Sequence, residues 1–410
     1  MNRQLSPTTD RQRYVVLDAL RGLALLGICL ANFPEFGLWT FLDADSQAAM
    51  PTAAADGVVR FLQYVVVDAK FYGIFSMLFG IGFSIILSHA QERGSSGIAL
   101  FYRRMGVLLL IAVAHLLLLW SGDILVLYAL TGMLLPLLCR LSDRALLGIA
   151  VGCIALPVGL DCWQEIGGFR LSAAVEAAWW RCAGTYGIDE GNFATWLRDC
   201  HSYVGVHQFL MQGAVERLYE FVDGHRLLKV LGLFLVGYVM GRNRLYARLP
   251  EWRRQLRRVC GWGLAVGLPT SVLYAVSATQ SHRWGLTVHS LLYTVSALPM
   301  SLAYMAGFAL LWLRWQRGVV FRALAQPGRM ALSNYIGQSC MGILIYYGIG
   351  MGMGLTQGLW QIECTAVGVF LLQVAVSALW MRRFRYGPLE WVWRMLTYGR
   401  RLPLTKRAAT

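Results

Sequence analysis

Ten apolar segments limit this chain to very few folds. Most of them approach the roughly 20 residues that a helix needs to cross the hydrocarbon core of a bilayer. Backbone groups in lipid must be hydrogen-bonded within the protein, so these segments are predicted to be helices. The segments are 15–39, 69–90, 104–121, 123–140, 143–160, 226–243, 257–278, 286–313, 329–350 and 359–381. We therefore expect an all-α, polytopic integral membrane protein with ten transmembrane helices.

The overall composition supports a membrane partner and argues against nucleic acid. Hydrophobic residues make up 57% of the 410 residues, against about 45–50% in a typical soluble domain. The formal net charge is +15, but the basic residues lie between apolar segments rather than in a recognition module. That distribution is typical of membrane topology, so the predicted partner is the lipid bilayer.

The arginines and lysines also predict the orientation of the chain. If the N-terminus is cytoplasmic, 28 of the 37 basic residues fall on the cytoplasmic side. This bias favours an N-in, C-in topology, in which 40–68 and 161–225 are external.

The pattern divides the chain into five regions. A cytoplasmic N-terminus (1–14) precedes a five-helix membrane bundle (15–160) and an extracytoplasmic loop with amphipathic helices (161–225). A second five-helix bundle (226–381) and a basic cytoplasmic tail (382–410) follow, and the last ten residues or so are expected to be disordered.

The nine cysteines predict no metal site, because they show no CxxC pair and no Cys/His ligand spacing. Cys162, Cys182 and Cys200 share one polar loop, which leaves one disulfide open.

The first apolar segment contains an unusual polar stripe. Asp18 and Arg21 are three residues apart, so they share a helix face and can pair. Asn32 follows Arg21 by eleven residues, close to three helical turns, and lies on the same stripe. Arg21 either extends to the inner headgroups with Asp18 as its counter-ion, or faces a polar cavity that binds substrate.

Several stretches together resemble one known family. The opening "LDALRGLALLGICLANF" resembles the start of the YeiB-like family (domain of unknown function 418), which is related to a wider clan of membrane acyltransferases with an L-D-x-L-R-G start. The similarity extends from about residue 14 to residue 400 through "KFYGIFSMLFGIGF", "AHLLLLWSGDILVLYALTG", "GRMALSNYIGQSCMGILIYYG" and "GPLEWVWRMLTYG". The clan implies that acyl-CoA enters from the cytoplasm and that the acceptor, a glycan, lipid or small molecule, binds nearer the outer side.

One position departs from the acyltransferase branch of the clan. There, the arginine is followed eleven residues later by a histidine taken to be catalytic, whereas this chain has Asn32. Asparagine cannot act as a general base, although its amide can donate a hydrogen bond to an oxyanion.

His115 is the candidate substitute for the missing base. It lies in the third segment, and Asp123 follows in the predicted hairpin turn. A neighbouring carboxylate can fix the imidazole tautomer and raise its basicity, which suits removal of a proton from an acceptor. The alternatives are a structural histidine bonded to a neighbouring helix, and an aspartate that caps the fourth helix.

Three further polar residues within or beside the apolar segments are candidates for substrate binding. Lys70 begins the second segment beside Asp68, and the two are expected either to form an interfacial pair or to belong to the site. Asn334 and Gln338 share a face of the ninth segment, where they either line a passage or join neighbouring helices.

The sequence therefore leads to a hypothesis and two competitors. The hypothesis is a multi-pass acyltransferase of the cell membrane, in a bacterial inner membrane, with acyl-CoA as donor. The competitors are a transporter or exporter of a small molecule or lipid, and a non-catalytic member of the fold.

Overall fold

The computed structural model describes residues 14–92, 94, 97–316 and 318–406, which form helices and no extended sheet. The first part contains α1 (Val15–Phe36), α2 (Ala44–Ala49), α3 (Ala53–Leu62), the π-helical turn η3 (Gln63–Val67), α4 (Lys70–Gln91), α5 (Ile98–Leu118), α6 (Leu125–Gly132), α7 (Leu135–Leu138) and α8 (Asp143–Gly167). Next come α9 (Ala173–Thr185), α10 (Phe193–Asp199), α11 (Tyr203–Asp223) and α12 (Arg226–Arg242). The last part contains α13 (Arg253–Thr279), α14 (Leu286–Trp315), α15 (Val319–Arg329), α16 (Ala331–Tyr346), α17 (Leu359–Arg383) and α18 (Pro388–Tyr398). The expected all-α class is confirmed.

Seven of the described helices are long and apolar enough to cross a membrane. An eighth is added if α11 and α12, which meet at 66°, form one broken span. Two of the predicted spans, 226–243 and 329–350, correspond to shorter helices, α12 with 17 residues and α16 with 16. The predicted span 123–140 is divided into α6 and α7 near Pro136. The number ten therefore stays a prediction.

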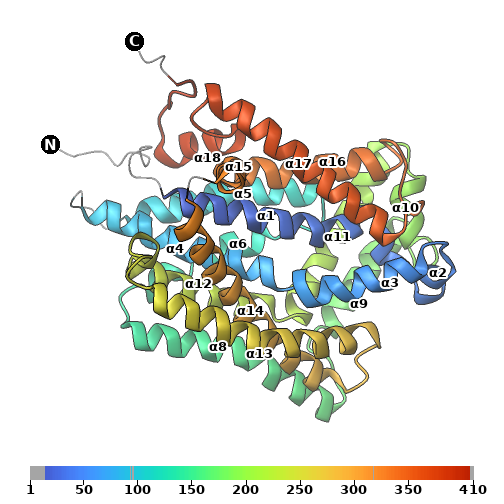
Figure 1. Ribbon diagram of the computed structural model, residues 1–410. Helices are drawn as coiled ribbons and strands as arrows, with labels where there is room; N and C mark the ends of the chain where they lie inside the picture. The colour runs from blue at the N-terminus through green and yellow to red at the C-terminus, as the bar shows by residue number, and fades with distance from the viewer. Residues whose placement is uncertain (1–13, 93, 95–96, 317, 407–410) are drawn as a thin grey trace.

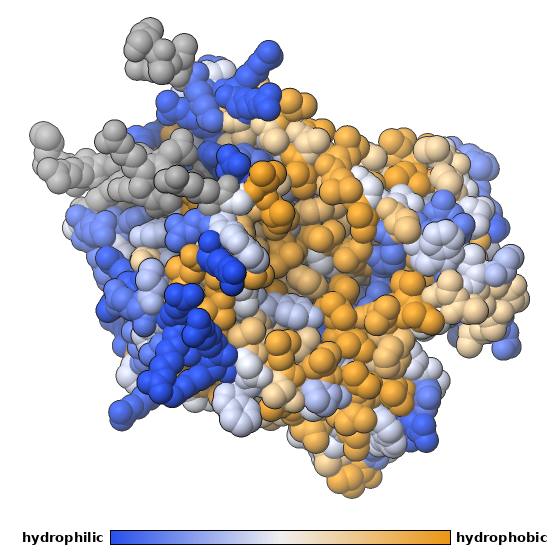
Figure 2. Space-filling model, in the orientation of Figure 1, coloured by the Kyte–Doolittle hydropathy of each residue, from blue (hydrophilic) through white to orange (hydrophobic). Residues whose placement is uncertain are grey.

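The outer surface of the bundle is apolar in the way that a membrane protein requires. Figure 2 shows hydrophobic side chains gathered over the middle of one face, with hydrophilic residues towards its two ends. Large apolar side chains on α5, α8, α13 and α17 point outward, including Leu110, Val151, Trp262 and Leu371. Water would penalise so much exposed apolar surface, whereas lipid solvates it. The chain is a multi-pass membrane protein.

The helices run between two opposite ends of the bundle (Figure 1). The rings of Tyr14 and Tyr246 are 4.6 Å apart, so the start of α1 lies beside the α12–α13 connection. Trp393 of α18 donates from Nε1 to the Arg104 carbonyl, 2.9 Å away, near the start of α5. We call this the terminal end, and the opposite end, which carries α2, α3 and α10, the loop end.

Close helix contacts depend on glycines at the interface between α4 and α12. A Cβ on Gly80 would lie 2.0 Å from the Phe234 carbonyl oxygen, and one on Gly237 would lie 2.0 Å from the Met77 carbonyl oxygen. Small residues therefore let the two backbones approach, as is common between membrane helices.

The predicted external regions contain more helix than the apolar pattern indicates. Segment 40–68 forms α2, α3 and η3, and segment 161–225 begins inside α8 and includes the 21-residue helix α11. Amphipathic helices were expected in 161–225, but a helix as long as α11 was not. Cys162, Cys182 and Cys200 are free thiols, like the other cysteines.

The expected disordered tail is wrong for residues 401–406. Trp391 Nε1 donates to the Leu402 carbonyl at 2.8 Å, and Phe384 pairs with Thr405 in an isolated β-bridge. These bonds hold the tail against α17 and α18, which the basic composition did not reveal; residues 407–410 lie outside the described part of the chain.

Candidate functional site

The tight turn after α5 brings His115 and Asp123 together. Helix α5 ends at Leu118, and α6 begins at Leu125. In this short connection Asp123 is placed with Oδ2 2.7 Å from His115 Nδ1. Both residues are buried, with 2% of His115 and 0% of Asp123 exposed. The predicted proximity of the imidazole and the carboxylate is confirmed.

The second carboxylate oxygen of Asp123 is also occupied. Asp123 Oδ1 accepts a hydrogen bond of 2.8 Å from the backbone N–H of Val126 in the first turn of α6. The capping role and the pairing with His115, considered as alternatives from the sequence, are therefore both present. With its two oxygens bound in different directions, the carboxylate is held in one orientation.

Ser339 completes the site, and sequence reasoning missed it. Its Oγ lies 2.9 Å from His115 Nε2, and its side chain is buried in α16 with 1% exposed. An ionised Asp123 can only accept, so a neutral His115 carries its proton on Nδ1. Nε2 is then the acceptor, and the Ser339 hydroxyl donates to it. Ser339 directly follows Gln338, which had been singled out, but a serine in an apolar helix gave no separate signal.

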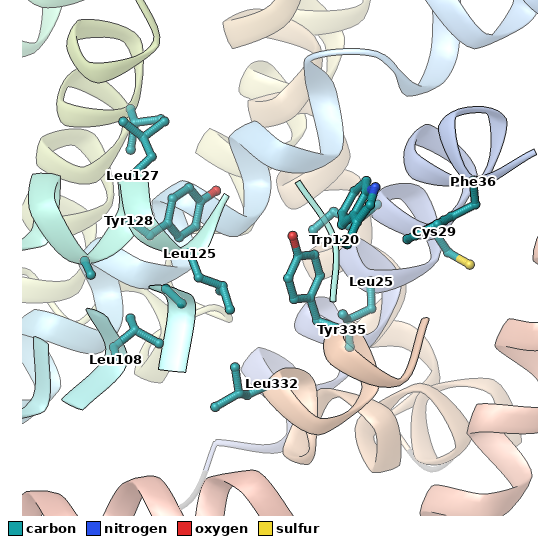
Figure 3. Close-up of a cluster of buried hydrophobic side chains, with 14 of the residues drawn as sticks. Leu25, Cys29, Phe36, Leu108, Trp120, Leu125, Leu127, Tyr128, Leu332 and Tyr335 are labelled. Atoms are coloured by element: carbon teal, nitrogen blue, oxygen red, sulfur yellow. The ribbon is translucent and has the colours of Figure 1, made fainter. Parts of the chain in front are cut away.

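Aromatic rings surround this group. The His115 ring centroid lies 5.4 Å from that of Tyr335 and 6.2 Å from that of Trp120. Figure 3 shows Trp120 and Tyr335 close to Leu25 of α1, and Trp120 also packs on Phe36, with centroids 4.5 Å apart. The three polar residues therefore lie in a mostly apolar environment, where hydrogen bonds and charges act more strongly than in water.

A charged cluster lies next to the turn at the loop end. Arg217 of α11 donates from Nε to the Ser121 carbonyl at 2.8 Å, and its Nη2 lies 3.9 Å from Glu35 Oε1. Arg217 also pairs with Glu220. Glu35 lies so close to the turn that a Cβ on Gly122 would be 2.6 Å from its Oε1. Neither Glu35 nor Arg217 is marked by a sequence pattern, although Glu35 is only three residues after Asn32.

Asn32 lies outside the hydrogen-bonded group of His115, Asp123 and Ser339. It is half-buried on α1, and among the described residues no hydrogen bond joins it to His115 or Asp123. Phe36, one turn after Asn32 on α1, packs on Trp120, whose ring centroid lies 6.2 Å from that of His115. The role of Asn32 as an oxyanion donor stays a prediction.

The predicted pair at the start of α1 is confirmed. Arg21 Nη1 lies 2.7 Å from Asp18 Oδ1, with 27% of the Arg21 side chain and 4% of the Asp18 side chain exposed. Arg21 and Arg394 are near enough to Arg104 for their charges to repel it. Three arginines from α1, α5 and α18 therefore gather at the terminal end.

Lys70 lies in a separate polar cluster. Its Nζ donates to the Tyr64 carbonyl at 2.6 Å and lies 5.4 Å from the centroid of the Tyr274 ring. Tyr274 in turn donates to Asp68 Oδ2 at 2.6 Å. Tyr274 thus connects Asp68 with Lys70, and no contact links Lys70 to the group around His115 in the described residues.

Asn334 and Gln338 join α16 to α17. Asn334 Nδ2 donates to Ser377 Oγ at 3.0 Å, and Gln338 Nε2 donates to Gln373 Oε1 at 3.1 Å. Gln373 Nε2 returns a bond of 2.8 Å to the Asn334 carbonyl. Of the two roles considered from the sequence, the contact between helices is the one with a structural basis. These bonds also fix the helix that carries Ser339.

The comparisons with known proteins agree with the motif resemblance. Residues 240–400 match the family model described as "Protein of unknown function (DUF418)". The chain carries a DUF418 region. It is also 28% identical to "Uncharacterized protein YxaH" of Bacillus subtilis (strain 168), over 98% of both chains. A further relative, "Uncharacterized protein YeiB" of Escherichia coli (strain K12), is 27% identical over 94% of this chain and 96% of its own length. The resemblance to the YeiB-like family is confirmed.

Proposed function

We propose that this DUF418 protein is a membrane-embedded acyltransferase, which moves an acyl group from a cytoplasmic acyl-CoA to an acceptor nearer the outer side. The observation that carries the proposal is His115, which is bound at Nδ1 by Asp123 and at Nε2 by a hydroxyl. A neutral imidazole oriented by a carboxylate is suited to removing a proton from an attacking hydroxyl. In the mostly apolar surroundings, competing water is kept away.

The arginines at the terminal end support the choice of donor. Arg21, Arg104 and Arg394 lie towards that end on α1, α5 and α18, near enough for their charges to interact. Clustered guanidinium groups suit phosphate, and a CoA nucleotide carries several phosphate groups. The basic residues around the terminal end support its assignment to the cytoplasm. The apolar helices support a place in the cell membrane, and the relative in E. coli favours a bacterial inner membrane.

Acyl-CoA turnover tests the proposal. The full-length protein in lipid nanodiscs would be supplied with radiolabelled acetyl-CoA, and free CoA would be separated by chromatography, because the free cysteines react with thiol reagents. We expect saturable binding of acetyl-CoA and release of CoA above the rate of empty nanodiscs. A transporter or a non-catalytic protein has no reason to bind acetyl-CoA, so a lack of both binding and release would overturn the proposal.

A further inference from the structure

We propose that Ser339 is the nucleophile of this site and carries the acyl group as an ester between donor and acceptor. The inference rests on the proposed function and goes beyond it, because an acyltransferase can also transfer the group directly between two bound substrates. In the proposed mechanism the acyl group is transferred in two half-reactions instead of one, and His115 acts in both.

The geometry supplies each connection that an activated serine requires. Ser339 Oγ lies 2.9 Å from His115 Nε2, and His115 Nδ1 lies 2.7 Å from Asp123 Oδ2. A nucleophile within hydrogen-bond reach of a base, which is itself oriented by a third group, is the general sign of covalent catalysis. The arrangement is recognised by its geometry rather than by residue order, since it recurs on unrelated folds.

The three side chains are also fixed in place by contacts away from one another. Asp123 is held by the Val126 N–H. Ser339 lies in the middle of α16, whose first turn donates two N–H groups to Glu390 of α18 and whose other face is bonded to α17. A serine that only donated a hydrogen bond to His115 Nε2 would not need so constrained a helix. A nucleophile reacts faster when its position is fixed.

A donor for the developing oxyanion is available on the same helix. Tyr335 lies one turn before Ser339, and its ring centroid is 5.4 Å from that of His115. Its hydroxyl oxygen accepts a bond of 3.3 Å from the Ile124 N–H, so the phenol is held near the turn that carries Asp123. The phenol proton can then donate to negative charge that develops beside Ser339.

The two half-reactions balance without any further reactant. In the first, Ser339 Oγ forms a bond to the thioester carbonyl carbon, its proton passes to His115 Nε2, the C–S bond breaks, and the CoA thiolate takes that proton. In the second, the acceptor hydroxyl attacks the acyl-serine ester and gives its proton to His115. The bond between the acyl carbon and Ser339 Oγ then breaks, and Oγ recovers the proton.

Fluorophosphonate–biotin tests the nucleophile without an acyl donor, because it forms a phosphonyl ester with activated serines. The full-length protein in nanodiscs would be compared with Ser339→Ala, His115→Ala and the control Ser84→Ala. Ser84 is a buried serine of α4 whose hydroxyl donates to the Ile81 carbonyl of its own helix. We expect labelling of the wild type and of Ser84→Ala, with at least tenfold less in the other two variants, and a labelled peptide containing Ser339. Size-exclusion profiles identify variants that fail to fold, and Ser339→Cys, which keeps a side chain beside Nε2, replaces Ser339→Ala in that case.

Radiolabelled acetyl-CoA then separates failure of this inference from failure of the proposed function. Protein-bound label that requires Ser339 and is released by alkaline hydroxylamine supports the ester. CoA release that persists in folded Ser339→Ala overturns the serine step and leaves the proposed acyl transfer standing. Fluorophosphonate labelling of Ser339 without any use of acetyl-CoA supports the nucleophile and overturns the acyl-CoA donor. An absence of both signals in the wild type overturns both.

Discussion

His115 Nε2 lies 2.9 Å from Ser339 Oγ, although the two residues are 224 positions apart in the chain. His115 belongs to the first predicted bundle (15–160), and Ser339 belongs to the second (226–381). A further link between the two halves runs from the Cys29 thiol to the Ala366 carbonyl, at 3.5 Å. The candidate site is therefore assembled only when both halves of the chain pack together, and neither bundle would carry it alone.

The first prediction concerns the base. Replacing His115 by alanine should lower kcat for acetyl-CoA turnover by about 10²–10⁴-fold, because a positioned general base contributes that much. His89→Ala is the matched control, since His89 is a half-buried histidine of α4 away from the turn. Asn32→Ala should have a smaller effect than His115→Ala, because no hydrogen bond joins Asn32 to His115 or Asp123. Full activity of a folded His115→Ala protein would exclude the site.

The second prediction concerns the arginines at the terminal end. Arg21→Ala should raise KM for acetyl-CoA by roughly 10–100-fold with little change in kcat, because a hydrogen bond to a charged group is worth about 1.5–3 kcal/mol and would be lost equally from ground and transition states. Acetyl-pantetheine lacks the nucleotide phosphates, so the variant and the wild type should use it equally. Arg283→Ala, at the loop end, is the charge control. Equal KM values for acetyl-CoA in wild type and Arg21→Ala would remove Arg21 from donor binding.

The sequence predicted local relationships in this protein well. Asp18 and Arg21 lie one helical turn apart, so their pairing followed from helix geometry. His115 and Asp123 are separated by a single short connection between two helices, so their proximity followed from the predicted hairpin turn. The limits of the long apolar helices were also close: segment 69–90 is α4 (Lys70–Gln91). In such cases the contact depends on a few neighbouring residues, and their spacing is sufficient to predict it.

Relationships between distant segments could not be predicted in the same way. Ser339 reaches His115 only through the packing of α16 against the rest of the bundle, which no periodicity encodes. The same limitation applies to Glu390, which bonds the start of α16 from another helix. Asn32 shows the same limitation. Helix geometry places it on the same face of α1 as Arg21, but that position does not predict which side chain of another helix it contacts.

The third prediction tests the glycine contact between α4 and α12. Gly80→Ala should destabilise the protein, because the new Cβ would lie 2.0 Å from the Phe234 carbonyl oxygen and the backbones would have to separate. Gly82→Ala is a control on the same helix, where nothing lies within 4 Å of the added Cβ. It should be neutral or slightly stabilising, since alanine is favoured over glycine in a helix by about 0.5–1 kcal/mol. Thermal unfolding in detergent measures the difference, and equal stability of the two variants would contradict the packing.

The fourth prediction concerns the cap that α18 provides for α16. Glu390 accepts bonds from the backbone N–H groups of Leu332 and Ser333, at 2.7 and 3.0 Å. Glu390→Ala should therefore cost about 0.5–2 kcal/mol of stability, the usual range for a lost N-terminal cap. Burial raises the pKa of the Glu390 carboxyl, because the charged form is poorly solvated there. The neutral Glu390→Gln keeps an accepting oxygen and avoids that cost, so it should lose less stability than Glu390→Ala. Glu251→Ala removes an exposed glutamate paired with Arg248 and serves as the control, because exposed ion pairs contribute little. A Glu390→Ala protein as stable as Glu251→Ala would show that the cap is dispensable.

The last prediction concerns orientation, which follows from the charge of the loops rather than from the helices. Arg253 lies in the basic segment that starts α13, and Glu190 lies in the exposed turn between α9 and α10. Each would be replaced by cysteine in a chain that retains only Cys29, which is fully buried. The positive-inside rule places Arg253 in the cytoplasm and Glu190 outside. A membrane-impermeant maleimide should therefore label the Glu190→Cys protein on intact cells, and the Arg253→Cys protein only after lysis. Labelling of Arg253→Cys on intact cells would reverse the topology, and with it the assignment of the arginine cluster to a cytoplasmic donor.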